Sequence, residues 1–168
     1  GNAPLKENLA SGLLKMTEWN GTKPLVDLMC GSGTFLIEAI NQILKVPLKF
    51  QQFYLFENWL DFNKYIFLEE KNKAQKRVVT FEKLSKTIGC EINKDVFDQA
   101  KVNIKLAGLE NYIELQNDDF KNIQFKSSEG LVLCNPPYGK KLGDENELIT
   151  LYEDMGEFLK KNFSGWEF

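Results

Sequence analysis

The sequence predicts an α/β fold in which a mostly parallel, doubly wound sheet carries helices on both faces. Short apolar runs alternate along the chain with longer segments of helical periodicity, and this alternation is typical of parallel strands joined by crossover helices. The 168 residues, 43% hydrophobic and 27% charged, suit one domain with a proper core. In such sheets, ligands bind at the carboxyl ends of the strands.

A helix, a buried strand and a second helix are expected in residues 5–44. The first helix, 5–18, has an imperfect apolar stripe formed by Leu9, Leu13, Leu14 and Met16. The turn signal Asn20-Gly21 precedes an apolar run at 25–29, which is fit for a buried strand. Residues 34–44 then repeat apolar side chains at helical spacing.

Residues 45–85 contain many aromatic side chains, followed by a polar, lysine-rich run. We expect a packed aromatic loop and then a helix over about 62–77. A second strand is predicted at 86–91. Asn93 can cap the helix that follows to Ala107, and Gly108 can end it.

The remaining elements are predicted strands at 112–115 and 131–134 and a helix at 145–161. The run 131–134 has no charged residue, as expected of a central parallel strand. Asp144 can cap the last helix, and residues 166–168 can begin a fifth strand.

Composition excludes several chemistries. The chain has no histidine, which excludes histidine-based acid–base or triad chemistry and leaves no credible zinc site. Cys30, Cys90 and Cys134 form no close pair and are expected to be reduced thiols in the cytoplasm. No apolar run is long enough to span a bilayer, and no leader is apparent.

The charge balance argues against tight binding of nucleic acid by this chain alone. The net charge is −3 and Arg77 is the only arginine, whereas phosphate binding depends on Lys and Arg. Local basic groups remain at Lys71, Lys73, Lys76 and Arg77, and at Lys140-Lys141. The alternative for both groups is a solvated surface, and for the first group this is the favoured interpretation.

The predicted strand at 25–29 ends in a glycine-rich turn, Asp27 to Thr34. Gly31 and Gly33 let the backbone turn tightly and approach a ligand closely. No Gly-Lys-Ser/Thr follows, so this is not a phosphate loop, and Leu36 replaces the third glycine of a dinucleotide fingerprint. A strand-to-helix turn without a ligand remains an equal alternative.

Acidic residues follow the next two predicted strands. Glu91 is placed to accept hydrogen bonds from both hydroxyls of a ribose, although it can also simply favour the dipole of the following helix. Asp118 and Asp119 can accept from an adenine amino group, but adjacent aspartates are also ordinary loop formers.

The fourth predicted strand is followed by Asn135-Pro136-Pro137-Tyr138. Two prolines make the backbone rigid and remove two N–H donors, so this turn presents hydrogen-bond acceptors. Two acceptors that hold the protons of an aryl amine can turn its lone pair towards an electrophilic methyl group. The Tyr138 ring can stack on an extruded base. The alternative is a rigid strand exit without chemistry.

Together these segments resemble class I methyltransferases of the Rossmann-like fold, of the type that methylates amino groups. More closely, the chain resembles bacterial 23S rRNA guanine methyltransferases of the THUMP-containing group, often labelled adenine-specific DNA methylases. The resemblance is carried in order along the whole chain by Ala3–Glu7, Asp27–Thr34, Phe56–Trp59, Gly89–Ile92, Asn135–Gly139, Leu151-Tyr152, Met155-Gly156 and Gly165-Trp166.

The resemblance implies S-adenosyl-L-methionine as cofactor, ribosomal RNA as substrate and a role for each motif. The residues implied to bind the cofactor are Asp27, Met29, Cys30, Gly31, Ser32, Gly33, Thr34, Glu91, Ile92, Asp118 and Asp119. The first seven would cradle the methionine part, Glu91 the ribose and Ile92 the adenine face. The residues implied to hold the target base are Asn135, Pro136, Pro137 and Tyr138. No metal is implied.

The resemblance also implies that residues 1–168 are a fragment of a catalytic domain, without the RNA-binding region and the last strands, so that the sheet is truncated after its fourth or fifth strand. An exposed sheet edge would then favour self-association. The leading hypothesis is methylation of guanine-N2 in 23S rRNA. The alternatives are adenine-N6 methylation of DNA, methylation of a protein glutamine, and a binding module or inactive fragment without turnover.

Overall fold

The computed structural model describes residues 5–47, 53–79, 84–137 and 145–168. The chain divides into two compact units. We call residues 1–40 with 84–168 the sheet unit, and residues 41–83 the insert. Asp144 and the pair Lys140-Lys141, for which a cap and a basic group were expected, lie outside the described residues.

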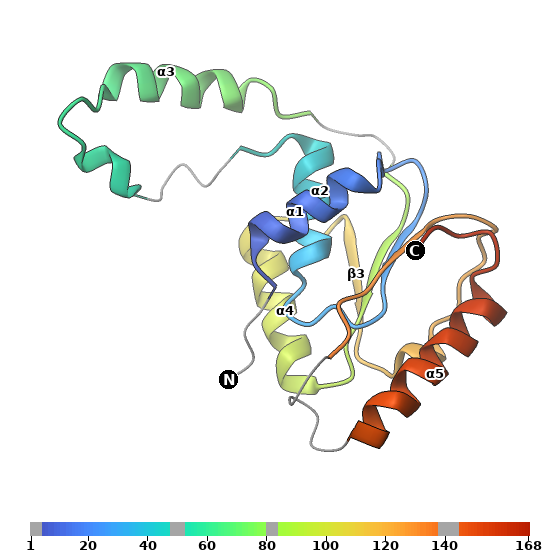
Figure 1. Cartoon of the computed structure of the whole chain (residues 1–168). Helices are drawn as coiled ribbons and strands as arrows, with labels where there is room; N and C mark the ends of the chain where they lie inside the picture. The colour runs from blue at the N-terminus through green and yellow to red at the C-terminus, as the bar shows by residue number, and fades with distance from the viewer. Residues whose placement is uncertain (1–4, 48–52, 80–83, 138–144) are drawn as a thin grey trace. The chain divides into compact units, whose positions relative to one another are not determined.

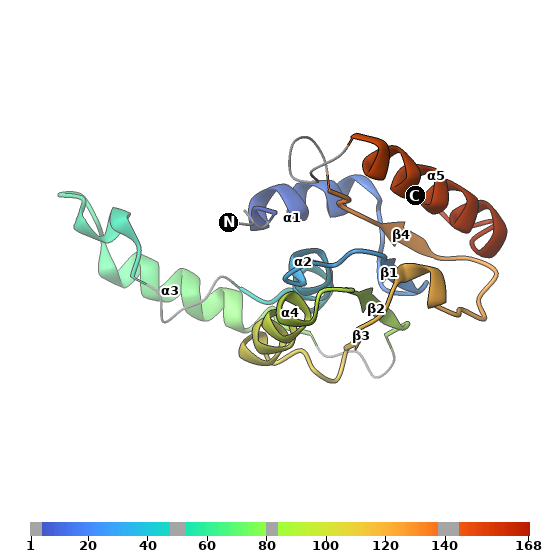
Figure 2. The same cartoon turned by 90° about the horizontal axis from the view of Figure 1, so that it is seen from below.

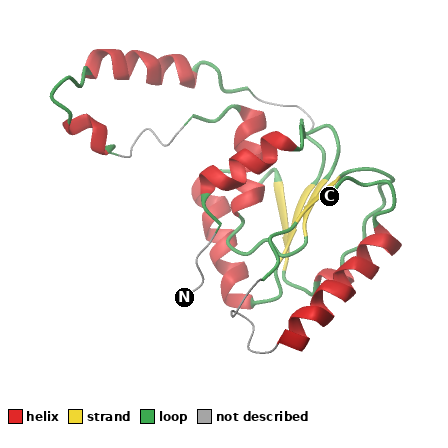
Figure 3. Cartoon of the chain, viewed as in Figure 1, coloured by secondary structure: helices red, strands yellow, loops and turns green. Residues whose placement is uncertain are grey.

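The sheet unit is built on four parallel strands (Figure 3). Their order is β3-β2-β1-β4, with β1 at Leu25–Asp27, β2 at Thr87–Cys90, β3 at Ile113–Gln116 and β4 at Leu131–Leu133. The predicted parallel, doubly wound sheet is confirmed, with each strand within one or two residues of its expected bounds. The chain passes from β1 through β2 to β3 and then returns to β4 on the other side of β1. This reversal makes the carboxyl end of β1 a switch point, the kind of position where ligands bind in such sheets.

The expected fifth strand is present only as a single bridge. Glu167 pairs in parallel with Leu131 beside β4. The Val132 N–H donates to the Glu167 carbonyl, and the Glu167 N–H donates to the Gly130 carbonyl, both at 2.9 Å. The sequence therefore placed this segment correctly beside the sheet, but no strand is formed within the described residues.

Helices cover both faces of the sheet, as Figures 1 and 2 show. On one face lie α1 (Glu7–Met16), α2 (Thr34–Leu44) and α4 (Lys94–Ala107), and on the other lies α5 (Glu145–Asn162). The predicted limits of α4 are confirmed. The Asn93 side chain accepts from the N–H groups of Asp95 and Val96, and Gly108 ends the helix with a left-handed φ of 71°.

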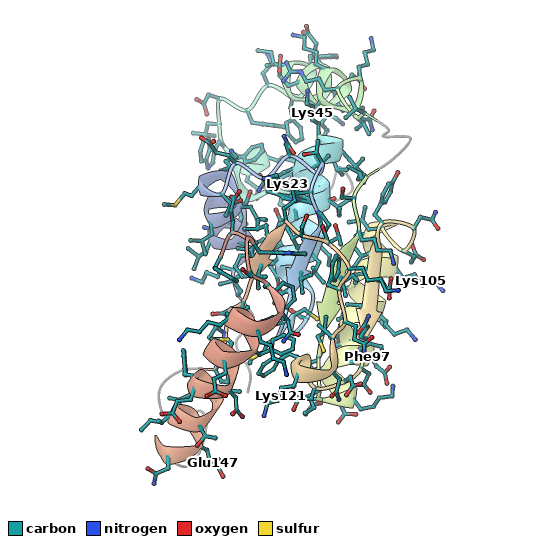
Figure 4. The ribbon with its side chains drawn as sticks, turned by 90° about the vertical axis from the view of Figure 1, so that its right-hand side faces the viewer. Lys23, Lys45, Phe97, Lys105, Lys121 and Glu147 are labelled. Atoms are coloured by element: carbon teal, nitrogen blue, oxygen red, sulfur yellow. The ribbon has the colours of Figure 1, made fainter. Side chains whose placement is uncertain are left out.

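The core beneath α5 is aromatic. Phe158, Phe163 and Trp166 pack against Val26 of β1 and Val132 of β4. The rings of Phe163 and Trp166 are 4.9 Å apart and nearly perpendicular, a favourable edge-to-face geometry. Gly130 is required here, because a Cβ at this position would overlap the Trp166 ring. Lys121 of η2 (Phe120–Asn122) forms an ion pair with Asp154 of α5 (Figure 4).

The predicted apolar stripe of α1 was wrong in most of its members. Leu14 is buried, together with Ala10, but Leu9, Leu13 and Met16 are exposed. A narrow contact face formed by one small and one large side chain is enough to attach this helix. The broader hydrophobic periodicity did not reveal which side would face the core.

The insert is a small aromatic assembly, as expected. It contains η1 (Leu55–Asn58) and α3 (Lys64–Gln75), with the Asn63 side chain capping α3. The Phe56 ring lies 5.3 to 6.1 Å from four other rings, those of Tyr54, Trp59, Phe62 and Phe67. These rings, from two short helices and the loop between them, hold the insert together.

Candidate active site at the carboxyl ends of the strands

The register of the sheet aligns the predicted site residues. Asp27 of β1 pairs with Gly89 of β2 and with Leu133 of β4, so these three residues form one row across the sheet. Glu91 and Asn135 each follow that row by two residues. Because all four strands are parallel, the glycine-rich turn, Glu91 and Asn135 emerge at the same edge.

The glycine-rich turn after β1 has the conformation that its glycines allow. Gly31 and Gly33 have φ values of +54° and +84°, a region that favours glycine. The Cys30 N–H donates to the Cys90 carbonyl at 2.8 Å, which holds the turn against the end of β2. The Asn103 side chain of α4 donates to the Ser32 carbonyl at 3.0 Å. Hydrogen bonds from the β2 side and from α4 therefore fix the conformation of the turn.

Glu91 is held by two backbone donors. Its Oε2 accepts from the Gly31 N–H at 3.1 Å and its Oε1 from the Asn93 N–H at 2.8 Å. A carboxylate has about four lone-pair positions, so capacity remains for two ligand hydroxyls. The Asn117 side chain donates to the Glu91 carbonyl at 2.7 Å and fixes this residue from the β3 side. Ile92 follows with an exposed apolar side chain.

Asp27 is the most strongly perturbed acid of the site. It is 1% exposed, and burial raises the pKa of its carboxyl group to about 7, against one backbone hydrogen bond from Met29 at 3.2 Å. The nearby negative charge of Glu91 raises this pKa further. A buried carboxylate without a cationic partner is costly, and it would be stabilised by a cation bound at this edge.

Asp118 and Asp119 take part in a local turn after β3. The Asp119 carboxylate accepts from the Lys121 N–H at 2.9 Å and caps the short helix η2. Asp118 accepts from the Asn122 side chain at 2.7 Å. The Cys90 thiol donates to the Asp118 carbonyl at 2.9 Å, so this turn is joined to the end of β2. These contacts agree with the alternative that Asp118 and Asp119 are loop formers. Their contact with a ligand stays a prediction.

Asn135 is exposed directly after β4, and Pro136 and Pro137 are half-buried. Leu133 of β4 pairs with Asp27 of β1, which brings this strand exit beside the glycine-rich turn. The Tyr152 hydroxyl of α5 lies 3.5 Å from the Pro137 carbonyl and can donate to it. Tyr138 lies outside the described residues.

The three thiols are unsuited to nucleophilic chemistry. Burial raises the pKa of Cys30 and of Cys134 and raises that of Cys90 to about 11, so all three remain protonated at neutral pH. All are free cysteines. Within the described ranges, no group of three acidic, cysteine or histidine side chains is arranged to hold a metal ion.

Three contributors had no role assigned from the sequence. Asn103, Asn117 and Tyr152 all bind backbone carbonyls of loops that are distant in the chain. Tyr152 lies in a segment that carries the resemblance, and Asn103 stands one residue before Ile104 on the inward side of its predicted helix. A polar side chain beside a buried stripe favours a tertiary hydrogen bond.

Comparison with known proteins agrees with this geometry. The whole chain, residues 1–168, matches the family described as RMKL-like, methyltransferase domain. The chain belongs to this family. The predicted fold class and the predicted resemblance to S-adenosylmethionine-dependent methyltransferases of this type are thereby confirmed.

Two curated members of the RMKL-like family illustrate the match. A Synechocystis protein named as a candidate RNA methyltransferase is 41% identical over 99% of this chain, which covers 43% of that protein. Ribosomal RNA large subunit methyltransferase K/L from Psychromonas ingrahamii is 35% identical over 99% of this chain, which covers 23% of it. The chain thus spans less than half the length of each relative.

Two solved structures have the same fold. SMU.472, a candidate methyltransferase solved with SAH, superposes with a TM-score of 0.87 at 29% identity, over 99% of this chain and 44% of its own. A predicted N6-adenine-specific DNA methylase from Listeria monocytogenes superposes with a TM-score of 0.85 at 31% identity, over 99% of this chain and 43% of its own.

Among the described helices, none is both long and apolar enough to cross a membrane.

Proposed function

We propose that this chain is the cofactor-binding and catalytic part of a methyltransferase that modifies an exocyclic amine of a nucleic-acid base, with guanine-N2 of 23S rRNA as the target. The observation that carries the proposal is the position of Asn135-Pro136-Pro137, which leaves the sheet beside a braced glycine-rich turn. This arrangement puts acceptors for an amine at the same edge of the sheet as Asp27, whose buried carboxylate suits a cationic cofactor.

S-adenosyl-L-methionine suits the residues at this edge. Its ammonium and sulfonium charges would lie near the buried carboxylate of Asp27, and its ribose hydroxyls near Glu91. The remaining cofactor contacts are proposed for Met29, Cys30, Ser32, Thr34, Ile92, Asp118 and Asp119. When bound, this cofactor supplies the electrophilic methyl group.

The chain's own contribution is to orient the amine. The Asn135 side-chain oxygen and a carbonyl of the Pro136-Pro137 segment accept hydrogen bonds from the two N–H groups of the amine. The nitrogen lone pair then points at the methyl group. No strong base is required, in agreement with the absence of histidine and with thiols whose pKa is raised. Stacking of Tyr138 on the base is part of the same proposal.

The test is transfer of labelled methyl groups by the full-length protein to unmodified 23S rRNA. Asn135→Ala should lower kcat at least about 100-fold while calorimetry still detects S-adenosylmethionine. Asn111→Ala, another exposed asparagine, should change neither quantity. Loss of both transfer and cofactor binding in Asn135→Ala would mean that Asn135 is structural.

The second candidate is adenine-N6 methylation of DNA, which the name of the Listeria neighbour favours. The same acceptors suit either base, so the site geometry does not separate them. Parallel assays on rRNA and DNA do: label in DNA adenine with none in RNA would replace the first proposal. Absence of cofactor binding in the folded full-length protein would instead favour a binding module.

We also propose that residues 1–168 form the catalytic portion of a longer protein, because the chain spans less than half of each relative. Its nucleic-acid affinity would then be shared with other regions. Self-association through the sheet edge at β4 or β3 stays a prediction. Ribosomal RNA as partner and a cytoplasmic location belong to the same proposal.

A further inference from the structure

The insert has a charge opposite to that of the sheet unit. Its 43 positions, 41–83, contain eight basic and five acidic residues, a net charge of +3, whereas the rest of the chain has a net charge of −6. The excess lies on α3 and the two residues after it. Residues 64–77 alone contain five basic and two acidic side chains.

The two acids of α3 share one ion-pair partner within the helix. Lys73 forms ion pairs with both Glu69 and Glu70 at 2.8 Å, and these contacts raise its pKa. Lys76 and Arg77 at the end of α3 have no carboxylate within ion-pair distance among the described residues. The positive charges of Lys73 and Arg77 lower the pKa of Glu70. Residues 64–77 still contain three more basic than acidic side chains, so this end of the insert is a positive surface.

One side of α3 is aromatic and polar, and it faces away from the ring cluster. Phe67 points into the cluster, where it contacts Phe56. Tyr65, Asn72 and Lys76 recur at intervals of seven and four residues, which places them on the opposite side of a helix with 3.6 residues per turn. Tyr65 is 86% exposed, unlike the rings that pack around Phe56. Trp59, at the edge of the cluster, is 68% exposed.

We infer that the insert binds a single-stranded segment of RNA through Tyr65, Asn72, Lys76 and Arg77. Exposed rings beside an excess of basic side chains suit a strand whose phosphates are negative and whose bases are free to stack. A protein partner would need an acidic surface, and the exposed rings alone do not favour one. The inference rests on the proposed function in taking RNA as the substrate, and it assigns the RNA contact that the acidic sheet unit does not supply.

The first measurement is fluorescence anisotropy of the 168-residue chain with a labelled, unstructured RNA of about 12 nucleotides, at several salt concentrations. Lys76→Glu with Arg77→Glu should weaken binding at least about tenfold and reduce the slope of log affinity against log salt by roughly 1.4, or about 0.7 per phosphate contact. The matched control is Lys160→Glu with Lys161→Glu, which places the same charge change in the last turn of α5. Its slope should stay close to that of the original chain.

Tyr65→Ala should weaken binding about tenfold, and Tyr65→Phe should retain it, because stacking needs the ring and not the hydroxyl. The exposed position predicts an unchanged melting temperature for both variants. Absence of RNA binding by the original chain at low salt would overturn the inference. Equal losses of RNA affinity in the two charge-reversal pairs would also overturn it. So would the finding that the chain forms a dimer and that Tyr65→Ala dissociates this dimer.

The two proposals fail differently. RNA binding that depends on the insert, without methyl transfer by the full-length protein, would remove the proposed function and leave this inference. Methyl transfer to rRNA that is unaffected by the insert variants would support the proposed function and remove this inference. Calorimetry with S-adenosylmethionine should give the same affinity for every insert variant, since none of the changed residues is placed in the cofactor site.

Discussion

At the scale of single residues, one acid of the site, Asp27, reduces the stability of the fold, whereas Glu91 does not. Glu91 keeps two backbone donors and remains partly accessible, whereas Asp27 is buried with one backbone hydrogen bond. Burial of a carboxylate without a cation raises its pKa because the charged form loses its hydration. Asp27 is therefore expected to reduce stability in the unliganded protein and to strengthen binding of a cationic ligand.

Asp27→Asn tests this trade-off. The raised pKa means that the folded protein binds a proton more tightly than the unfolded chain, so between about pH 4 and pH 7 the free energy of unfolding falls as pH rises. The penalty reaches on the order of 4 kcal/mol above pH 7. The variant should lose this pH dependence and be more stable than the original protein at pH 8, as measured by urea unfolding.

Cofactor binding should respond in the opposite sense. The affinity for S-adenosylmethionine is expected to fall as pH drops below about 7, where Asp27 becomes protonated, and Asp27→Asn should bind weakly at every pH. Calorimetry at pH 6 and pH 8 measures both. Equal affinities of the two proteins at pH 8 would show that Asp27 does not contact the charged part of the cofactor.

At the scale of elements, local chemistry accounts for the helix ends and tertiary packing for the exceptions. Asn93 and Gly108 were identified from the sequence as the limits of α4, because caps act within a few residues. Gly89, in the middle of β2, had no such local signal. It is required because α2 packs closely on the strand at this point.

Gly89→Ala should destabilise the protein by about 1–3 kcal/mol. The added Cβ would overlap Leu36 of α2 and lie 2.9 Å from Leu115 and 3.0 Å from the Cys30 sulfur. Gly12→Ala in α1 is the matched control, since its Cβ would meet nothing within 4 Å. It should raise stability by about 0.5–1 kcal/mol through helix propensity. Denaturant unfolding midpoints, with unchanged slopes, would measure both changes in the free energy of unfolding. Equal changes in the two variants would contradict the packing argument.

At the scale of the whole molecule, the chain consists of two units with separate cores. The insert is held by rings around Phe56, and the sheet unit by aliphatic and aromatic side chains on both faces of the sheet. Units with separate cores can open separately. Local loss of structure in the insert should therefore leave the cofactor site intact.

Phe56→Ala should remove roughly 2 kcal/mol or more of local stability from the insert, because it deletes the ring that contacts four others. Hydrogen exchange should accelerate in α3 and remain slow in the strands β1 and β2. Leu60→Ala is the control, since its side chain is fully exposed. Equally fast exchange throughout the sheet unit in Phe56→Ala would mean that the two units unfold together.

The sequence by itself determined the order and type of the elements, the parallel α/β class and the strand-end motifs. Periodicity, turn glycines and caps act between neighbouring residues, so the limits of α2 and α4 were predicted closely. The same local signals predicted too broad a stripe on α1, where only the packing partner decides which side is buried.

Only the tertiary structure decided the strand order β3-β2-β1-β4, the separation of the insert, and the contacts that assemble the site. The hydrogen bonds from Gly31 to Glu91, from Asn103 to Ser32 and from Asn117 to the Glu91 carbonyl join residues far apart in the chain. Such contacts depend on the register between parallel strands and on how the helices pack over them. No local pattern encodes either of these, because both are set by how the whole core fills its space.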